Sequence, residues 1–520
     1  MGRRSMKRLP EIRLPFDHRP EELDAAVARR GVPHGVHWRV LKKSLDARHK
    51  RHIVFVYSIG LPEPSDENVD SPLRRRPPDP RPIIVGAGPA GLFAAYRLAV
   101  SGVPALILEQ GDAMPERVVA MARFMRYGQL DERSNLGFGA GGAGAYSDGK
   151  LMTRIRSRHI PFIMDTFVRF GGPEEIRYLA NPHLGSSRIR RAIHRMIEHL
   201  EDLGVEVRFR SQVRSFRIRD RQIEGVVLEN DNEIAASAVL LAAGHSARRL
   251  YVELERLGVA MEFKAFAAGL RLEHPAALIN RIQFGPHSDH PALGAAAYRL
   301  THTWGGDENR RALYSFCMCP GGFVLNAATE SDGVVSNGMS NTGRRGDFSN
   351  AAFVVNVGAN DIEGEHLQRG VEWQRDLEQK AAAAANPSGG AHALPAQRLQ
   401  DFLSARTSLH LPPSSCPNPL RPARLDTLLP SFIIEAMHTG LEVFERRMRG
   451  LCSEEALLVG VESRTSAPVR IVRDSESRQS LTAAGLYPIG EGAGYGGGIT
   501  SAAADGVAAA DALLETLPAG

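Results

Sequence analysis

The fold is decided by one stretch, Ile83-Ile84-Val85-Gly86-Ala87-Gly88-Pro89-Ala90-Gly91-Leu92-Phe93-Ala94-Ala95. An apolar strand runs into a glycine-rich turn, and a helix follows. Gly86 permits the tight turn, Gly88 lets the backbone approach a pyrophosphate, and Gly91 lets the helix pack closely on the strand. The N–H groups that open the helix have no intrahelical partners and can bind phosphate oxygens. Pro89 lacks an N–H, but its fixed φ suits the first helical turn.

A carboxylate follows at the expected distance. A second apolar run, residues 105–108, ends in Glu109, where a group that hydrogen-bonds ribose hydroxyls is expected. The alternative is a glycine turn in an ordinary α/β protein, because the fingerprint alone gives false positives. With Glu109 in place, the sequence predicts a dinucleotide-binding α/β domain.

The C-terminal segment distinguishes a flavin from a nicotinamide cofactor. Residues 485–499 read Gly-Leu-Tyr-Pro-Ile-Gly-Glu-Gly-Ala-Gly-Tyr-Gly-Gly-Gly-Ile, and an alanine-rich helix follows over 501–514. Glu491 is placed to bind ribityl or pyrophosphate-side hydroxyls. The N-terminus of the helix favours negative charge on a reduced flavin ring. A dehydrogenase that uses only NAD has no need of this second strand–turn–helix, so the sequence predicts FAD.

A third glycine-rich run spans residues 135–150. Glycine at this density suits a backbone that lies against a planar ring, and a flexible surface loop is the alternative. Ser147, Asp148 and Lys150 supply donors and acceptors, and Lys150 is predicted to bring positive charge to the flavin pyrimidine.

Other reactive side chains are scattered. Cys317 and Cys319 lie two residues apart, a spacing that bridges poorly in a strand, so structural or pocket-lining roles are favoured over catalytic thiols. Histidines and cysteines show no metal-binding spacing, so no metal is expected. His245 follows a strand end and is the first candidate for a proton donor.

Composition bounds the class of protein. The chain has 520 residues, 43% of them hydrophobic, and a net charge of +5, as expected for a soluble protein of two or three domains. We expect no membrane span and no secretory signal. Four cysteines form no disulfide framework, so a cytoplasmic location is expected.

The excess positive charge falls in residues 1–81. Nucleic acid binding is not expected there, because no aromatic residues are interleaved with the charge. Solvated surface is favoured, and a protein partner is the alternative. Residues 1–61 are predicted to form a small basic α+β domain, with a helix over 20–30 and strands near 12–16, 38–41 and 52–57. Residues 62–81 are predicted to be a linker, and the Ala/Pro/Gly-rich passage 381–396 a loop.

These segments together resemble a family of FAD-dependent dehydrogenases or oxidoreductases of largely unassigned substrate. The motifs that carry the resemblance are Ser44–Arg48, Gly86–Gly91, Gly141–Lys150, Pro182–Gly185, Gly244–Arg248, Phe316–Gly322, Asn337–Ser340, Arg464–Pro468 and Gly490–Tyr495. The family looks like a branch of the glutathione-reductase-type flavoproteins. The resemblance implies an α/β fold in which a Rossmann-like FAD-binding domain (82–255 and 456–520) is interrupted by an α+β substrate or cap domain (256–455).

The resemblance also places FAD contacts along the chain. Gly86, Gly88 and Gly91 would hold the pyrophosphate, Val213 would lie by the adenine, and Gly490 and Glu491 would follow the ribityl chain. The complete set of predicted contacts is Gly86, Ala87, Gly88, Pro89, Ala90, Gly91, Glu109, Gln110, Arg117, Gly142, Ser147, Asp148, Gly149, Lys150, Val213, Ala243, Gly244, His245, Gly490, Glu491, Gly492, Gly497, Gly498 and Ile499.

The predicted function is hydride transfer between non-covalently bound FAD and a small-molecule substrate or NAD(P)H. Lys150, His245 and Cys317 are the candidate catalytic groups. With one dinucleotide fingerprint, any NAD(P)H would visit as a transient electron donor. A flavin-dependent hydroxylase or a reductase of C=C bonds is the enzymatic alternative. A weakly catalytic flavoprotein that binds a partner or nucleic acid through its basic N-terminal domain is the other.

Overall fold

A parallel sheet forms around the glycine-rich turn. The computed structural model describes residues 7–33, 35–61, 74–306 and 310–520. Five parallel strands lie in the order β23 (Leu486–Pro488), β11 (Val239–Leu241), β5 (Ile83–Val85), β6 (Leu106–Leu108) and β7 (Glu206–Arg208). All but β7 are fully buried apolar triplets, as expected when helices cover both faces of a parallel sheet.

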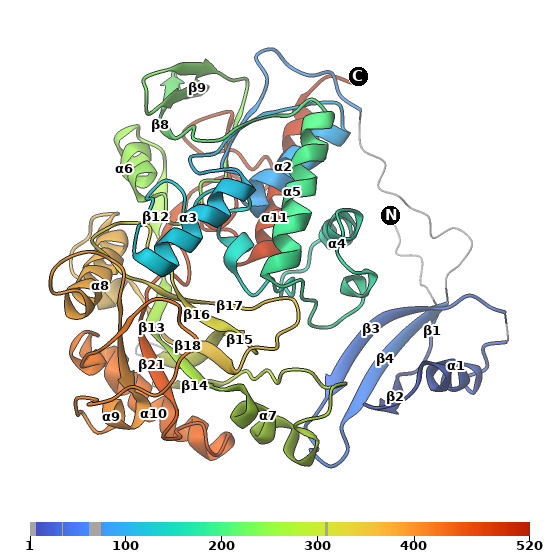
Figure 1. Cartoon of the computed structure of the whole chain (residues 1–520). Coiled ribbons are helices and arrows are strands. Elements are labelled where there is room, and N and C mark those ends of the chain that lie inside the picture. The colour runs from blue at the N-terminus through green and yellow to red at the C-terminus, as the bar shows by residue number, and fades with distance from the viewer. Residues whose placement is uncertain (1–6, 34, 62–73, 307–309) are drawn as a thin grey trace.

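Helices from both ends of the chain cover this sheet. α2 (Pro89–Val100) packs against α11 (Ile499–Thr516) and α5 (Ser186–Asp202), and the three lie side by side in Figure 1. Close packing of α11 on α2 requires Gly506, where a Cβ would lie 2.1 Å from the Ala90 carbonyl oxygen. The remaining helices of this part are α3 (Met114–Tyr127), α4 (Ile160–Arg169) and α6 (Arg248–Arg256).

An antiparallel meander precedes β11. It consists of β8 (Val213–Arg219), β9 (Gln222–Leu228) and β10 (Glu233–Ala235), in the order β10-β9-β8.

The inserted part is built on a seven-stranded sheet. Its order is β14 (Thr301–Trp304), β15 (Arg311–Cys319), β18 (Phe348–Val357), β13 (Phe266–Pro275), β21 (Leu457–Glu462), β19 (Leu394–Arg398) and β20 (Leu420–Pro422). The helices of this part are α7 (Ala276–Phe284), α8 (Arg369–Ala385), α9 (Leu399–Leu403) and α10 (Ser431–Arg447). Two small sheets pair β16 (Phe323–Asn326) with β17 (Ser336–Met339), and β12 (Met261–Phe263) with β22 (Val469–Ile471).

Two sequence-based boundaries are wrong. β21 begins at Leu457, beyond the predicted boundary at 455, yet it pairs with β13 and β19 in the seven-stranded sheet. Residues 381–385, predicted as loop, form the last turn of α8, where Ala381, Ala382 and Ala385 are buried. Alanine is the best helix former, and packing of this face fixes the helix.

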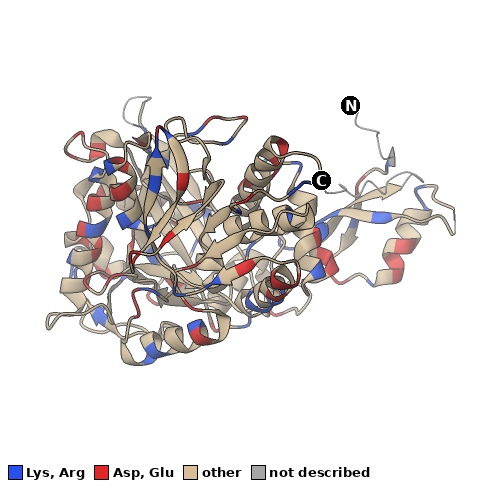
Figure 2. Ribbon diagram, turned by 90° about the horizontal axis from the view of Figure 1, so that it is seen from above, with Lys and Arg blue, Asp and Glu red and all other residues tan. Residues whose placement is uncertain are grey.

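The small N-terminal unit lies to one side of the main body. It comprises β1 (Lys7–Arg8), β2 (Ile12–Pro15), α1 (Pro20–Ala28), β3 (Arg39–Asp46) and β4 (Val54–Leu61). β3 docks on the main body through backbone bonds of Lys43 to Tyr178 and Ala180. Phe16 contacts the ring of His287, just after α7, at 5.0 Å. In Figure 2 both signs of charge occur in this unit, with the acidic residues Glu21 and Glu22 in the first turn of α1.

The predicted linker is only partly described. Residues 62–73 lie outside the described part of the chain. Residues 74–81 run along the parallel-sheet layer, where the Arg75 backbone N–H donates to the Ser101 carbonyl at 2.9 Å.

Candidate functional site

The glycine-rich turn leaves no room for side chains at two positions. Gly86 has φ +106°, and a Cβ there would lie 2.5 Å from the Ala242 carbonyl oxygen at the end of β11. A Cβ on Gly91 would lie 2.0 Å from the Gly86 carbonyl oxygen. Gly88 is different, because it precedes α2 and a Cβ there would meet nothing nearer than 3.8 Å. The turn therefore presents the first N–H groups of α2, which have no intrahelical partners, to a phosphate.

Glu109 lies directly beneath this turn. Its carboxylate accepts backbone hydrogen bonds from Ala87 at 2.8 Å, Gly111 at 2.9 Å and Gly139 at 2.9 Å, and the residue is 4% exposed. Oε2 receives only one of these bonds. Because a carboxylate offers about four acceptor sites, Oε2 retains capacity for one ribose hydroxyl. The contacts also join the turn, the end of β6 and the glycine-rich loop.

Arg117 holds the glycine-rich loop in place. Its five N–H groups donate to the carbonyls of Asn135, Leu136, Gly139 and Ala140. Burial lowers its pKa to about 10. The prediction of a direct contact between Arg117 and FAD is therefore wrong: no donor is left, and the residue positions the loop.

The loop held by Arg117 packs on the start of α2. The Gly141 backbone N–H donates to the Ala87 carbonyl at 2.8 Å, and a Cβ on Gly142 would lie 3.0 Å from the Gly88 Cα. The sequence placed this loop against the ring of the cofactor. The structure brings Gly142 to the turn at 86–91 that is predicted to hold the pyrophosphate, so the start of the loop borders that turn.

The C-terminal segment meets the turn from the other side. A Cβ on Gly490 would lie 2.8 Å from the Ala90 Cβ, and one on Gly492 would lie 2.4 Å from the Gly244 carbonyl oxygen. The Thr500 hydroxyl donates to the Leu151 carbonyl at 2.7 Å. The structure thus brings together three of the predicted segments: the turn at 86–91, the strand end at 243–244 and the run at 490–500.

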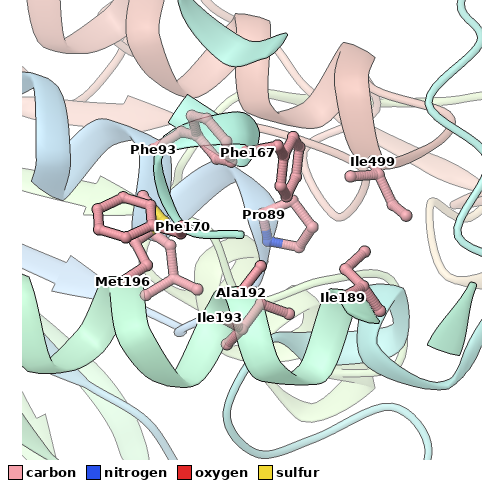
Figure 3. Close-up of a pocket in the computed structure, with 10 residues that line it drawn as sticks. Pro89, Phe93, Phe167, Phe170, Ile189, Ala192, Ile193, Met196 and Ile499 are labelled. Carbon is pink, nitrogen blue, oxygen red and sulfur yellow. The ribbon is translucent and has the colours of Figure 1, made fainter. Parts of the chain in front are cut away.

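Several predicted contacts point elsewhere. Figure 3 shows the side chains of Pro89 and Ile499 in an apolar pocket with residues of α5. That cavity, of about 10 Å³, has room for about one water, so it is not a flavin site. Val213 is buried in the core at the start of β8, whereas Gln110 is partly exposed directly after Glu109.

Other predicted residues keep local contacts. The Ser147 hydroxyl donates to the Gly144 carbonyl at 2.9 Å and accepts from the Gly149 N–H at 3.1 Å. The Gly497 N–H donates to the Ser501 hydroxyl at 3.0 Å, next to Gly498 at the start of α11. Ala243 packs beside the core under β11.

Glu491 is a half-buried residue whose carboxylate accepts a hydrogen bond from the Ala467 N–H at 3.2 Å. Burial raises its pKa to about 7, although the charge of Lys264 opposes the shift. Near neutral pH the side chain can therefore donate a hydrogen bond to a hydroxyl when protonated and accept one when ionised, which suits a polyol chain.

The raised pKa of Glu491 gives a pH-dependent stability. Because the folded-state pKa exceeds the ordinary value of 4.5, its contribution is fully present below pH 4.5 and is lost as the pH rises through 7. In flavin-free protein, Glu491→Gln is expected to gain about 1–3 kcal/mol relative to wild type between pH 5 and pH 8. Urea unfolding at both pH values measures this, with the exposed Glu515→Gln as control. Parallel pH profiles of wild type and Glu491→Gln would contradict it.

A charged cluster surrounds Asp148. Its side chain is 1% exposed and accepts from Ser340 and from Arg344 at 2.5 Å, while Lys150 Nζ lies at 3.6 Å. Burial opposes ionisation, but His183, Lys150 and Arg344 lower the Asp148 pKa to about 2. Asp148 is therefore a fixed anion that orients Lys150, whose side chain is 29% exposed.

His245 belongs to a different cluster. Burial and the charges of Arg464 and Arg248 lower its pKa to about 4, so the imidazole is neutral at pH 7. The charges that act on Cys317 are those of Lys150, Arg271 and Asp148 instead. The predicted proton donor is therefore not an imidazolium, and a neutral His245 can donate one hydrogen bond and accept another.

Sequence reasoning missed the partners of these groups. Ser340, Arg344, Arg464 and Glu378 were not singled out as charged or polar contacts. The signal that could have found two of them was present, because the motifs Asn337–Ser340 and Arg464–Pro468 carry the family resemblance. Glu378 lies on α8 in a segment without any motif, and only the fold brings it to Arg248 and Arg464.

Three further observations concern metal binding, membrane spans and the cysteines. Among residues 7–33, 35–61, 74–306 and 310–520, no three His, Cys, Asp or Glu side chains gather in a group that could hold a metal ion. Within the same residues no helix combines the length and apolarity needed to cross a membrane. All four cysteines are free thiols.

Known proteins agree with the cofactor that this geometry accommodates. Residues 265–465 match the family model of the FAD-dependent protein C-terminal domain, and residues 6–61 match DUF8436, a domain of unknown function. The chain belongs to the class of FAD-dependent proteins, and FAD is its cofactor. An uncharacterized protein of Clostridium beijerinckii is 39% identical over 498 residues, 92% of each chain. The chain belongs to the same family as this clostridial protein.

Solved structures show more distant likeness. The flavin-dependent brominase Bmp2 is 11% identical with a TM-score of 0.37, covering 84% of this chain and 79% of its own. The E. coli quinol fumarate reductase FrdA is 12% identical with a TM-score of 0.38, covering 84% and 70%. These likenesses are too weak to indicate an activity.

Proposed function

We propose that the protein is an FAD-dependent oxidoreductase that transfers a hydride between a small-molecule substrate or NAD(P)H and non-covalently bound FAD. We further propose that the parallel sheet with its antiparallel meander is a Rossmann-like domain of the glutathione-reductase type. One observation carries the proposal: Asp148, 1% exposed, fixes the partly exposed Lys150 beside the start of α11.

The roles follow from position and charge. FAD, when bound, supplies a two-electron carrier. The α2 N–H groups would hold its pyrophosphate, Glu109 Oε2 would accept from the adenosine ribose, and Glu491 would bind the ribityl chain. Lys150 would stabilise the negative charge that forms during reduction, because a fixed cation in a site with little water acts strongly on developing charge. Asp148, itself held by Arg344, would keep Lys150 in position.

The single dinucleotide turn favours a transient role for NAD(P)H, as an electron donor that enters and leaves the substrate pocket. The small N-terminal unit, docked through β3, is free to bind a protein partner on its other surfaces, and nucleic acid is not part of the proposal. The free thiols are in keeping with a cytoplasmic location.

Anaerobic flavin reduction tests the function. The purified holoprotein is mixed with NADH, NADPH and a panel of small metabolites, and the flavin absorbance is followed. We expect at least one compound to bleach it. If none does, hydride transfer is the wrong function, whereas FAD binding stands. Oxygen uptake coupled to NADPH oxidation would favour a hydroxylase instead.

Lys150→Met tests the proposed role of the cation. We expect flavin reduction by the active donor to slow about 10–100-fold with the FAD content unchanged, because about 1.4–2.7 kcal/mol of charge stabilisation is lost. Lys380→Met, an exposed substitution on α8, is the matched control. An unchanged rate in Lys150→Met would contradict the role.

A further inference from the structure

Two thiols meet at an irregularity in β15. Phe316 lies opposite Ala352, whereas Cys319 lies opposite Asn350, so three residues of β15 span two of β18. Cys317, inside this bulge, has φ +44°, a left-handed conformation that non-glycine residues rarely adopt. Bulges of this kind redirect side chains and are frequent beside active sites.

The bulge removes the geometric objection to a bond between these cysteines. In a regular strand, residues two apart have Cα atoms about 6.6 Å apart, near the upper limit of about 6.8 Å for a disulfide. A bulge bends the strand, so the separation of a regular strand does not apply to this pair. Cys319 Sγ donates to the Cys317 carbonyl at 3.3 Å, so its sulfur lies against the residue that carries the other thiol.

The neighbouring strand leaves room for the sulfur atoms. Gly338 on β17 faces Cys319, and a Cβ there would lie 3.0 Å from the Cys319 Sγ. Arg271, fully buried, donates to the Asn350 side chain at 2.9 Å and to the Cys317 carbonyl at 3.4 Å. These contacts hold the bulge without occupying the space between the thiols.

The charges around the pair distinguish the two thiols. A hydrogen bond from Cys319 and the charges of Lys150 and Arg271 lower the Cys317 pKa to about 6, although burial opposes the shift. Cys319 has its pKa raised by the same hydrogen bond and by burial. At neutral pH the pair is therefore one thiolate and one thiol, which is the state from which a disulfide forms.

The pair is also close to the proposed flavin site. Lys150, whose charge acts on Cys317, precedes Leu151, and the Leu151 carbonyl accepts from Thr500 in the first turn of α11. The other two cysteines differ, because burial raises the pKa of Cys416 and of Cys452 to about 12. Only the pair in the bulge combines a partner thiol with nearby cations.

We propose that Cys317 and Cys319 form a reversible disulfide, a second redox centre that exchanges two electrons with the bound flavin. The Cys317 thiolate and the Cys319 thiol join in one S–S bond and give up two electrons. Oxidised FAD accepts both electrons and the Cys319 proton, which yields the anionic reduced flavin, so atoms and charge balance. The reverse reaction cleaves the S–S bond and returns a thiolate and a thiol. The proposal needs bound FAD but no particular substrate.

Anaerobic reductive titration of the purified holoprotein with dithionite tests it. We expect wild type to take up about four electrons per FAD, two for the flavin and two for the disulfide. Cys317→Ser and Cys319→Ser are each expected to take up about two. Cys416→Ser and Cys452→Ser, the matched controls, are expected to behave as wild type. Because dithionite is a chemical reductant, the result does not depend on which donor the enzyme uses.

Mass spectrometry gives a second measurement on the same samples. Acid-quenched, alkylated oxidised protein should carry the segment with Cys317 and Cys319 unalkylated, and reduced protein should carry both thiols alkylated. Uptake of only two electrons by wild type, with both thiols alkylated in the oxidised protein, would overturn the proposal. The proposal would also be overturned if the flavin of wild type were fully reduced after the same number of electrons as the flavin of the serine variants. The disulfide would then form without exchanging electrons with the flavin. Neither outcome bears on hydride transfer from a donor.

Discussion

Gly88→Ala is expected to give a folded protein that has lost most of its FAD. A Cβ at this position would meet nothing nearer than 3.8 Å, and the backbone does not require glycine, since φ is −79°. The added methyl group would project where α2 offers its N–H groups to a phosphate. We expect FAD affinity to fall at least about 10-fold, or about 1.4 kcal/mol, with the unfolding midpoint of the flavin-free protein unchanged.

Two further variants separate cofactor binding from folding. Gly91→Ala forces a Cβ to within 2.0 Å of the Gly86 carbonyl oxygen, so both FAD binding and stability should be lost. Gly306→Ala, where a Cβ would meet nothing within 4 Å, should change neither. Flavin absorbance per protein and urea unfolding measure the two properties. Full FAD content in Gly88→Ala would show that the turn does not face the pyrophosphate.

The features of this turn could be predicted because they are local. Gly86, Gly88 and Gly91 form one short motif, in which Gly91 is required by its contact with Gly86, and Glu109 follows from the next strand along the chain. Buried parallel strands can also be predicted, because they appear in the sequence as short runs of apolar residues. The FAD-binding half of the fold was therefore predictable from residues 83–109 and 485–499.

The rest depends on contacts that sequence spacing does not show. Arg117 was predicted to touch FAD, but the fold surrounds it with four carbonyl acceptors from the loop at 135–140. His245 was predicted to donate a proton, but burial, together with the charges of the distant Arg464 and of Arg248, lowers its pKa and keeps it neutral. Residues 457–462, which form β21, were assigned to the FAD-binding domain and not to the seven-stranded sheet. A run of six buried residues fits a strand of either sheet equally well.

Glu378→Gln is expected to destabilise the protein by about 3–5 kcal/mol, because it removes the buried anion shared by two buried guanidinium groups and leaves them only the partly exposed Glu330. The Glu378 side chain is 1% exposed and accepts from Arg248 at 2.8 and 3.0 Å and from Arg464 at 2.6 and 2.9 Å. Glutamine has nearly the same shape but only one accepting oxygen. Urea unfolding at pH 7 measures the loss.

Glu330→Gln is the matched control. Glu330 also binds Arg248, at 2.8 Å, but its side chain is 30% exposed. Solvent screens such a pair, so its loss should cost no more than about 1 kcal/mol. Equal effects of the two substitutions would show that burial does not set the strength of the cluster.

The pH dependence supplies a further check on Glu378. Burial opposes its ionisation, but Arg464 and Arg248 lower its pKa to about 2. Because the folded-state pKa lies below the ordinary value of 4.5, the contribution is present above pH 4.5 and is lost as the pH falls toward 2. The difference between wild type and Glu378→Gln should therefore shrink over that range and stay constant from pH 5 to pH 8.

The cluster also joins the inserted part to the part of the chain that contains the parallel sheet. Arg248 begins α6 directly after the strand end at 243–244, whereas Glu378 lies on α8 of the inserted part and Arg464 follows β21. Loss of the anion should loosen the inserted part from the parallel sheet, so Glu378→Gln should release FAD at a lower urea concentration than wild type does. If FAD release and global unfolding instead coincide in both proteins, the cluster stabilises the fold as a whole and does not act as a separate clamp between the layers.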